Sequence, residues 1–99
     1  MAKFFMKGKA EKKVPGGKLV KVSAEFGETI KSVKITGDFF LHPEEAIELI
    51  EKSLLGIGAN EQASAFEKAI SETTKKNDIQ MIGVSARDIA ETVREAVSK

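Results

Sequence analysis

The chain has 99 residues and a mass of 10.7 kDa, which predicts one domain, since single domains usually span about 50 to 200 residues. It has no Cys, which excludes disulfides, a thiol nucleophile and thiolate metal ligands. Its 16 Lys and Arg residues nearly balance its 15 Asp and Glu residues, which argues against a general nucleic-acid binder. No segment approaches the roughly 18 apolar residues that cross a membrane, and the charged start does not fit a signal peptide. We therefore expect a soluble, cytoplasmic protein without membrane contact.

The first part of the chain predicts one strand and one turn. The strand is expected around Lys3 to Lys9, with Phe4 and Met6 on one face. Gly8 and the charged residues that follow weaken this pattern. The turn lies at Pro15 to Gly17, where one residue has a fixed φ and two have permissive backbones.

The next two segments predict an antiparallel hairpin. From Lys18 to Phe26, apolar residues alternate with polar ones, as in a strand that is buried on one face. After a tight connection, Thr29 to Thr36 predicts the partner strand. Ile30 has the opposite parity from Val33 and Ile35, which indicates a β-bulge.

Two helices are expected in the centre of the chain. The first covers residues 43 to 55, because Pro43 suits the first helical position and Gly56 suits the end. The second begins after Asn60, a favourable N-cap, and ends near Lys76. Its apolar stripe consists of Ala63, Phe66, Ala69, Ile70 and Thr73.

The last part of the chain predicts a short apolar link and a third helix. Residues 79 to 82 fit either a brief strand or a packed loop. Ser85 followed by Asp88 resembles a capping box, and apolar residues at helical spacing continue to the C-terminus. The order of three strands and then three helices predicts an α+β fold, in which the helices pack on one face of a small antiparallel three-stranded sheet.

Charge is unevenly distributed along the chain. Residues 1 to 34 contain nine Lys and three Glu, whereas residues 35 to 72 contain two Lys and eight acidic residues. Two interpretations remain open. Each run forms a solvated face, or the Lys-rich part forms a positive patch for an anionic partner or ligand group.

Two glycine-containing segments do not meet the requirements of nucleotide-binding loops. For a P-loop that ends at Gly17-Lys18, the first Gly would stand where Lys12 stands, and Ser or Thr would replace Leu19. The segment from Gly56 to Gly58 lacks the third Gly of a dinucleotide fingerprint, since Glu61 occupies that position. Neither segment predicts nucleotide binding.

Acid–base and metal chemistry also lack candidates. The single His, His42, has Asp38 and Glu44 nearby, but one His among carboxylates at a strand-to-helix junction is typical of a capping or surface residue. Glu48 stands four residues before Lys52, which is typical of a solvated helix face with ion pairs. We therefore assign no catalytic residue and no metal site.

Several motifs stand between Lys13 and Gly56. They are a P-G-G-K-L turn at residues 15 to 19, an I-x-G-D-F-F junction at residues 35 to 40, a helix started by Pro, and its L-x-G stop. Together they resemble the accessory C-terminal domain of lipoate-protein ligase, which in bipartite ligases is a separate small chain. These motifs cover a little under half of the sequence, and the remaining helices agree by pattern.

The resemblance implies an accessory role. In that family a large catalytic domain binds ATP and lipoate, forms lipoyl-AMP and transfers the lipoyl group to a lysine of an acceptor domain, while the small domain assists activation. This chain would then bind no cofactor alone, and ATP, Mg²⁺ and lipoate would act in the complex. Its partners would be the large catalytic subunit and, indirectly, the lipoyl acceptor domain.

Lys34 begins a partial match to the lysine motif K-x-x-G-x-(A/G/S) of that large domain. The sixth position of the match is Phe39, and the glycine-rich triplet motif of the large domain is absent. We therefore place Lys34 on a strand surface. The chain also does not fit the lipoyl acceptor, which would be nearly all strand with a target Lys at a hairpin tip.

The candidate partner-proximal or ligand-proximal residues are Pro15, Gly16, Gly17, Lys18, Phe39 and Phe40. A permissive backbone beside an ammonium suits a partner or an anion such as phosphate or carboxylate, but a plain tight turn also explains it. If the two rings lie on an extended segment, they point to opposite sides, one to the helices and one to a partner. Otherwise both enter one core. Asp38 is assigned a structural role, accepting backbone N–H groups around the turn.

Two functions therefore remain. The first is the accessory subunit of a bipartite lipoate-protein ligase, a heterodimer in which this chain performs no covalent chemistry. The second is a nucleic-acid or protein interaction module that uses the Lys-rich sheet with Phe4 and Phe5, since basic residues interleaved with aromatics are typical of single-strand binding. The low aromatic content of 6% argues against the second.

Overall fold

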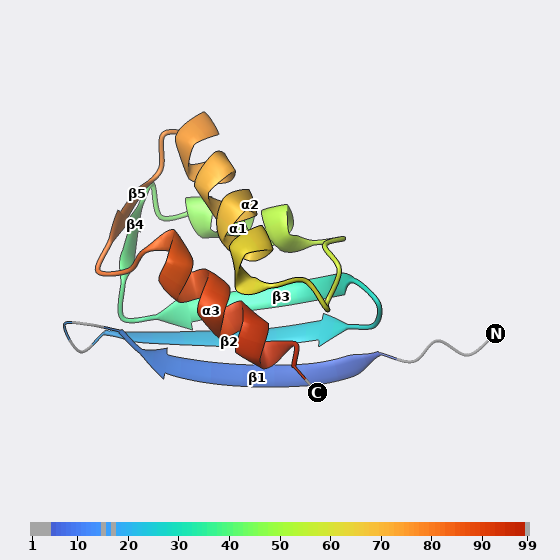
Figure 1. Ribbon diagram of the computed structural model, residues 1–99. Coiled ribbons are helices and arrows are strands. Elements are labelled where there is room, and N and C mark those ends of the chain that lie inside the picture. Colours follow the sequence, from blue (N-terminus) through green and yellow to red (C-terminus); the bar gives the residue numbers. More distant parts are fainter. Residues whose placement is uncertain (1–4, 15, 17, 99) are drawn as a thin grey trace.

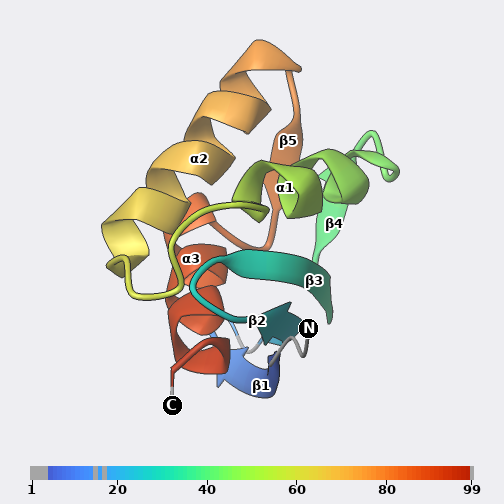
Figure 2. The same ribbon diagram turned by 90° about the vertical axis from the view of Figure 1, so that its right-hand side faces the viewer.

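The computed structural model describes residues 5–14, 16 and 18–98, which form an α+β fold (Figure 1). Strands β1, β2 and β3 form an antiparallel sheet in that order, and helices α1, α2 and α3 lie on one side of it (Figure 2). The predicted fold class is therefore confirmed. In addition, β4 and β5 pair as a separate two-stranded ribbon. The elements of the described residues are β1 (Met6–Lys13), β2 (Leu19–Phe26), β3 (Ile30–Gly37), β4 (Phe40–His42), α1 (Ala46–Leu54), α2 (Ala63–Lys76), β5 (Gln80–Ile82) and α3 (Ala86–Ala96).

The central hairpin has the predicted alternation and the predicted bulge. The buried residues of β2 are Val20, Val22, Ala24 and Phe26. In the pairing of β2 with β3, Phe26 opposes Ile30 whereas Glu25 opposes Ser32. Lys31 is thus the extra residue of the bulge. The shift turns Ile30 inward, where it is 1% exposed.

The first strand differs from its predicted position. β1 continues through the charged residues beyond Lys9 and ends at Lys13, whereas residues 1–4, which include Phe4, lie outside the described part. Gly8 lies within this strand, at the point where the end of α3 packs directly against it. A Cβ added at Gly8 would be 1.7 Å from the carbonyl oxygen of Ala96. The glycine that weakened the prediction therefore permits the close packing of β1 and α3.

The hydrophobic core lies between the sheet and the helices. α3 packs on β1 and β2, α1 packs on β3, and α2 packs on both α1 and α3. Phe66 and Ile70 of α2 and Ile89 and Val93 of α3 are fully buried at these contacts. One face of the sheet is therefore covered by the helical layer, and the other is open (Figure 2).

Two helices begin later than predicted. Between residues 43 and 48 the backbone hydrogen bonds join each N–H to the carbonyl three residues earlier. One example is the 3.1 Å bond from the Ala46 N–H to the Pro43 carbonyl. A turn therefore precedes α1. The N-cap of α2 is Gln62, not Asn60. Asn60 lies in a turn that the Ala59 N–H anchors to the connection between β2 and β3.

The helix ends and the third helix agree with the sequence. Gly56 follows the end of α1 with a φ of +86°, a conformation that glycine adopts at low cost. α2 ends at Lys76 as predicted. At the start of α3, Ser85 and Asp88 form a reciprocal capping box, with bonds of 3.1 and 3.0 Å.

Side chains also connect the helices to the sheet. Glu91 of α3 accepts hydrogen bonds from Lys12 of β1 and from Arg87, the latter at 3.2 Å. Glu51 of α1 accepts a 2.8 Å bond from the backbone N–H of Ile35, on the edge of β3 that does not pair with β2. The described helices include none that is both long and apolar enough to cross a membrane.

Candidate functional site

The turn between β1 and β2 contains four of the candidate residues. Pro15 and Gly17 lie outside the described residues. Gly16 is exposed, has a φ of +95°, and has no atom within 4 Å of an added Cβ. Lys18 is half-buried, and its aliphatic stem lies 3.5 to 3.8 Å from the position of a Cβ at Gly83. The Lys18 stem therefore lies against the end of β5.

The junction after β3 is held close to the start of β2. A Cβ at Gly37 would lie 2.1 Å from the Leu19 carbonyl oxygen, and the Asp38 N–H donates to that same oxygen at 2.9 Å. Among the described residues, no backbone N–H donates to the Asp38 carboxylate. The backbone of Asp38 fixes the junction instead.

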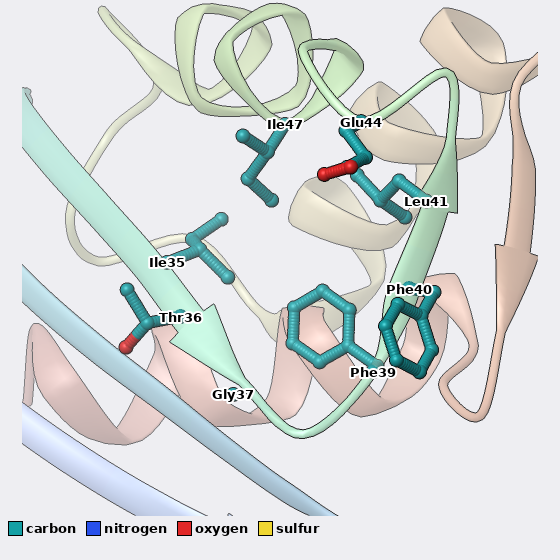
Figure 3. Close-up of a pocket in the computed structure, with 8 residues that line it drawn as sticks. All are labelled: Ile35, Thr36, Gly37, Phe39, Phe40, Leu41, Glu44 and Ile47. Carbon is teal, nitrogen blue, oxygen red and sulfur yellow. The ribbon is translucent and has the colours of Figure 1, made fainter.

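The two adjacent phenylalanines differ in their exposure to solvent. Phe39 is half-buried and packs against the core, whereas Phe40 begins β4 and is 65% exposed. Figure 3 shows the Phe39 ring between β3 and β4 and the Phe40 ring alongside β4. The alternative in which both rings enter one core is therefore wrong. The extended geometry leaves one ring free for a partner.

A hollow of about 330 Å³ lies beside these rings (Figure 3). Its apolar wall comes from β3, β4 and α1, and Glu44 supplies a carboxylate at its rim. The lining residues are Ile35, Thr36, Gly37, Phe39, Phe40, Leu41, Glu44 and Ile47. This hollow opens to solvent and suits an inserted apolar side chain of a partner.

The ribbon of β4 and β5 extends the apolar surface. Phe40 opposes Ile82 in the pairing, and opposite residues of antiparallel strands share a face. Ile82 is 54% exposed, so the pair presents two uncovered apolar side chains. The Lys18 stem lies against Gly83, which follows Ile82 in the chain. We call Lys18, Phe40, Ile82 and Gly83 the ribbon patch. Strands β4 and β5 lie at the end of the sheet where β1 connects to β2 (Figure 1).

Sequence reasoning selected Lys18 and Phe40 but missed their neighbours. The sequence allows either a strand or a loop at residues 79 to 82, and the structure shows the strand β5 there. β4 was not expected as a strand. The one available signal for Ile82 is its place at the end of the apolar link, directly before Gly83.

The ionisable candidates of the sequence lie apart on the surface. The described residues contain no cluster of three or more His, Cys, Asp or Glu side chains that could hold a metal ion. His42 is exposed on β4, Glu48 is exposed on α1, and Lys34 is exposed on β3, as predicted for a strand surface. The Lys12 hydrogen bond, followed by that of Arg87, lowers the pKa of the Glu91 carboxyl below its ordinary value of 4.5. This group ties α3 to β1.

The described residues form a small α+β fold with an exposed apolar ribbon. No protein-family model matches the sequence, and no curated protein matches it. The fold is similar to that of a chain from a structural study of an archaeal lipoylation system, a bi-partite lipoate protein ligase and its E2 lipoyl domain from Thermoplasma acidophilum. The TM-score is 0.68 and the identity 24%, over 92% of this chain and 96% of that chain. The two chains therefore share a fold over nearly their whole lengths.

Proposed function

We propose that this chain is the accessory subunit of a bipartite lipoate-protein ligase, which docks on a large catalytic chain and is required for lipoate activation. The shared fold with a chain of the Thermoplasma acidophilum system carries the proposal, together with the motifs between residues 13 and 56. The nearly complete coverage of both chains means that they have almost the same length.

The α+β architecture favours a ligase component over a lipoyl acceptor. A lipoyl acceptor is expected to be nearly all strand, whereas the described residues contain three helices on one sheet. Because the matched chain superposes over 96% of its length, it shares these helices. The resemblance therefore supports the accessory role for this chain.

The ribbon patch is the surface that we propose contacts the large chain. Phe40 and Ile82 supply apolar area, and Lys18 supplies a charge at its edge. Burial of such a pair contributes about 25 cal/mol for each Å² of apolar surface removed from water. The neighbouring hollow, with Glu44 at its rim, can receive a side chain of the partner.

The chain acts on chemistry through position alone. ATP, Mg²⁺ and lipoate bind the large chain, and docking of this subunit closes or completes their site. Formation of lipoyl-AMP requires alignment of two substrates and exclusion of water, so it depends strongly on closure. Transfer from lipoyl-AMP starts from an activated mixed anhydride and depends on closure less.

The decisive experiment measures the two half-reactions separately. The large chain from the same organism is assayed for lipoyl-AMP formation from lipoate, ATP and Mg²⁺, with and without this protein. We expect adenylate formation only with both chains and no activity of this chain alone. Transfer from preformed lipoyl-AMP should depend on this chain less. Equal adenylate formation without this chain would refute the proposal, and dependence confined to transfer would contradict the activating role.

A further inference from the structure

The open face of the sheet is a second surface with a defined charge pattern. Figure 2 shows the strands with helices on one side and no helix on the other. Nine outward residues of β1, β2 and β3 form three consecutive rows across the sheet. The rows are Lys7–Glu25–Ser32, Lys9–Ser23–Lys34 and Glu11–Lys21–Thr36. All nine residues are polar, and they include four Lys and two Glu.

The central row differs from its neighbours in its charges. In the first row Lys7 pairs with Glu25 at 3.7 Å, and in the third row Lys21 pairs with Glu11 at 4.0 Å. Lys9 and Lys34 of the central row form no ion pair with a described residue. Two uncompensated ammonium groups therefore flank one hydroxyl group.

The same three residues border two hollows on this face. The hollows have volumes of about 280 and 510 Å³, and the residues that line both are Lys9, Ser23 and Lys34. All three side chains are exposed. The central row therefore forms a ridge that a ligand can reach from both sides.

We propose that this ridge binds an acidic segment of a partner protein, whose carboxylates pair with Lys9 and Lys34 and accept a hydrogen bond from the Ser23 hydroxyl. A free phosphate is less suitable, because a sheet face offers no unpaired backbone N–H and exposed ion pairs contribute little individually. Nucleic acid is less suitable, because the nine residues include no aromatic ring on which bases could stack. A second copy would bring two positive faces together.

The size of the face sets the strength of this contact. Eight residues per strand and three strands correspond to an area of about 26 by 14 Å, or about 400 Å². A stable complex buries about 800 Å² on each partner. The contact is therefore transient, associates quickly and weakens with salt, since exposed charges are screened within about 8 Å at physiological ionic strength. The inference does not depend on the proposed function.

The test uses hexaglutamate as the probe, with backbone amide shifts in NMR as the readout. Titration should shift amides in the central rows of β1, β2 and β3. The double variant Lys9→Gln/Lys34→Gln should bind the probe about tenfold more weakly. It loses two exposed ion pairs with the probe, and each pair contributes only modestly to the affinity. The matched variant Lys68→Gln/Lys75→Gln removes the same charge from α2 and should bind within about twofold of the natural chain.

Three outcomes would overturn the inference. Equal losses in the two double variants would mean that the probe senses net charge alone. Shifts concentrated at Lys18 and the ribbon patch would place the acidic contact elsewhere. Pyrophosphate or a single-stranded hexanucleotide that binds as tightly as the peptide at the same ionic strength would assign the ridge to phosphate. Each variant is first compared with the natural chain by circular dichroism, which separates lost binding from lost folding.

Discussion

At the scale of single residues, two glycines determine how closely the elements approach one another. Gly8 admits the carbonyl of Ala96 at the end of α3, and Gly37 admits both the Leu19 carbonyl and the Phe39 ring. Side chains at these positions would collide with backbone atoms, which cannot rotate away. Both positions therefore require glycine because it has no side chain.

Gly8→Ala should destabilise the fold strongly. The added methyl would overlap the Ala96 carbonyl, so α3 and β1 must separate, at a cost of about 3 kcal/mol in unfolding free energy. Urea unfolding followed by circular dichroism measures this change. Gly58→Ala is the matched control, because its Cβ would meet the Glu61 side chain at 3.4 Å and Gly58 has no positive φ. An equal loss in both variants would show that close packing at Gly8 is not the cause.

At the scale of elements, the sequence predicted those whose signals are local. The alternation of β2, the parity change at Ile30 and the Ser85–Asp88 box are contained within a few residues, and all three appear in the structure. β4 was missed because a strand of three residues carries almost no periodicity. Its partner β5 lies about forty residues later, so the pairing depends on packing of the intervening helices.

The candidate surface was predictable to the same extent. Lys18 and Phe40 were selected because they belong to recognisable motifs. Ile82 and Gly83 have no such motif and reach Phe40 and Lys18 through the pairing of β5 with β4. The composition of this surface therefore depends on tertiary contacts, which spacing along the chain does not encode.

The connection between β1 and α3 predicts a dependence of stability on pH. The Lys12 and Arg87 hydrogen bonds lower the pKa of Glu91 in the folded chain, so the ionised carboxylate stabilises the fold above about pH 4.5. That contribution disappears as the pH falls through the lowered pKa, where the folded chain also takes up the proton. Glu91→Gln should therefore be less stable than the natural chain at pH 7, and the difference should shrink as the pH is lowered to 3.

Urea midpoints at the two pH values check this expectation. Glu95→Gln is a suitable control, because Glu95 is exposed on the same helix and makes no ion pair within the described residues. Its midpoint should follow that of the natural chain at both values. A difference for Glu91→Gln that is as large at pH 3 as at pH 7 would contradict a role for the ionised carboxylate.

At the scale of the whole molecule, the fold separates two surfaces. The ribbon patch lies at one end of the sheet, and the ridge of Lys9, Ser23 and Lys34 lies on the face away from the helices (Figures 1 and 2). Glu48, which is exposed on α1, belongs to neither. Variants on these surfaces can therefore be compared within one assembly assay.

Charge reversal at Lys18 should weaken assembly with the large chain far more than charge reversal at Glu48. Lys18 lies against Gly83, which follows the exposed Ile82, whereas Glu48 is exposed on α1. We expect Lys18→Glu to raise the Kd about tenfold, and Glu48→Lys to change it less than about twofold. Titration calorimetry at two salt concentrations measures both values, and association should slow as salt rises. Equal effects of the two variants would reject the ribbon patch as the interface.

The bond from the Ile35 N–H to Glu51 has a consequence for self-association. A three-stranded sheet has two free edges, and an unpaired edge can template cross-chain strand addition and aggregation. On β3, the Glu51 carboxylate occupies a backbone donor that an incoming strand would need. On β1, the lysines at positions 7, 9 and 13 would meet like charges on a second copy. Glu51→Leu should therefore expose the β3 edge and promote fibril formation. In the natural chain, Glu51 protects the β3 edge and the lysines protect the β1 edge.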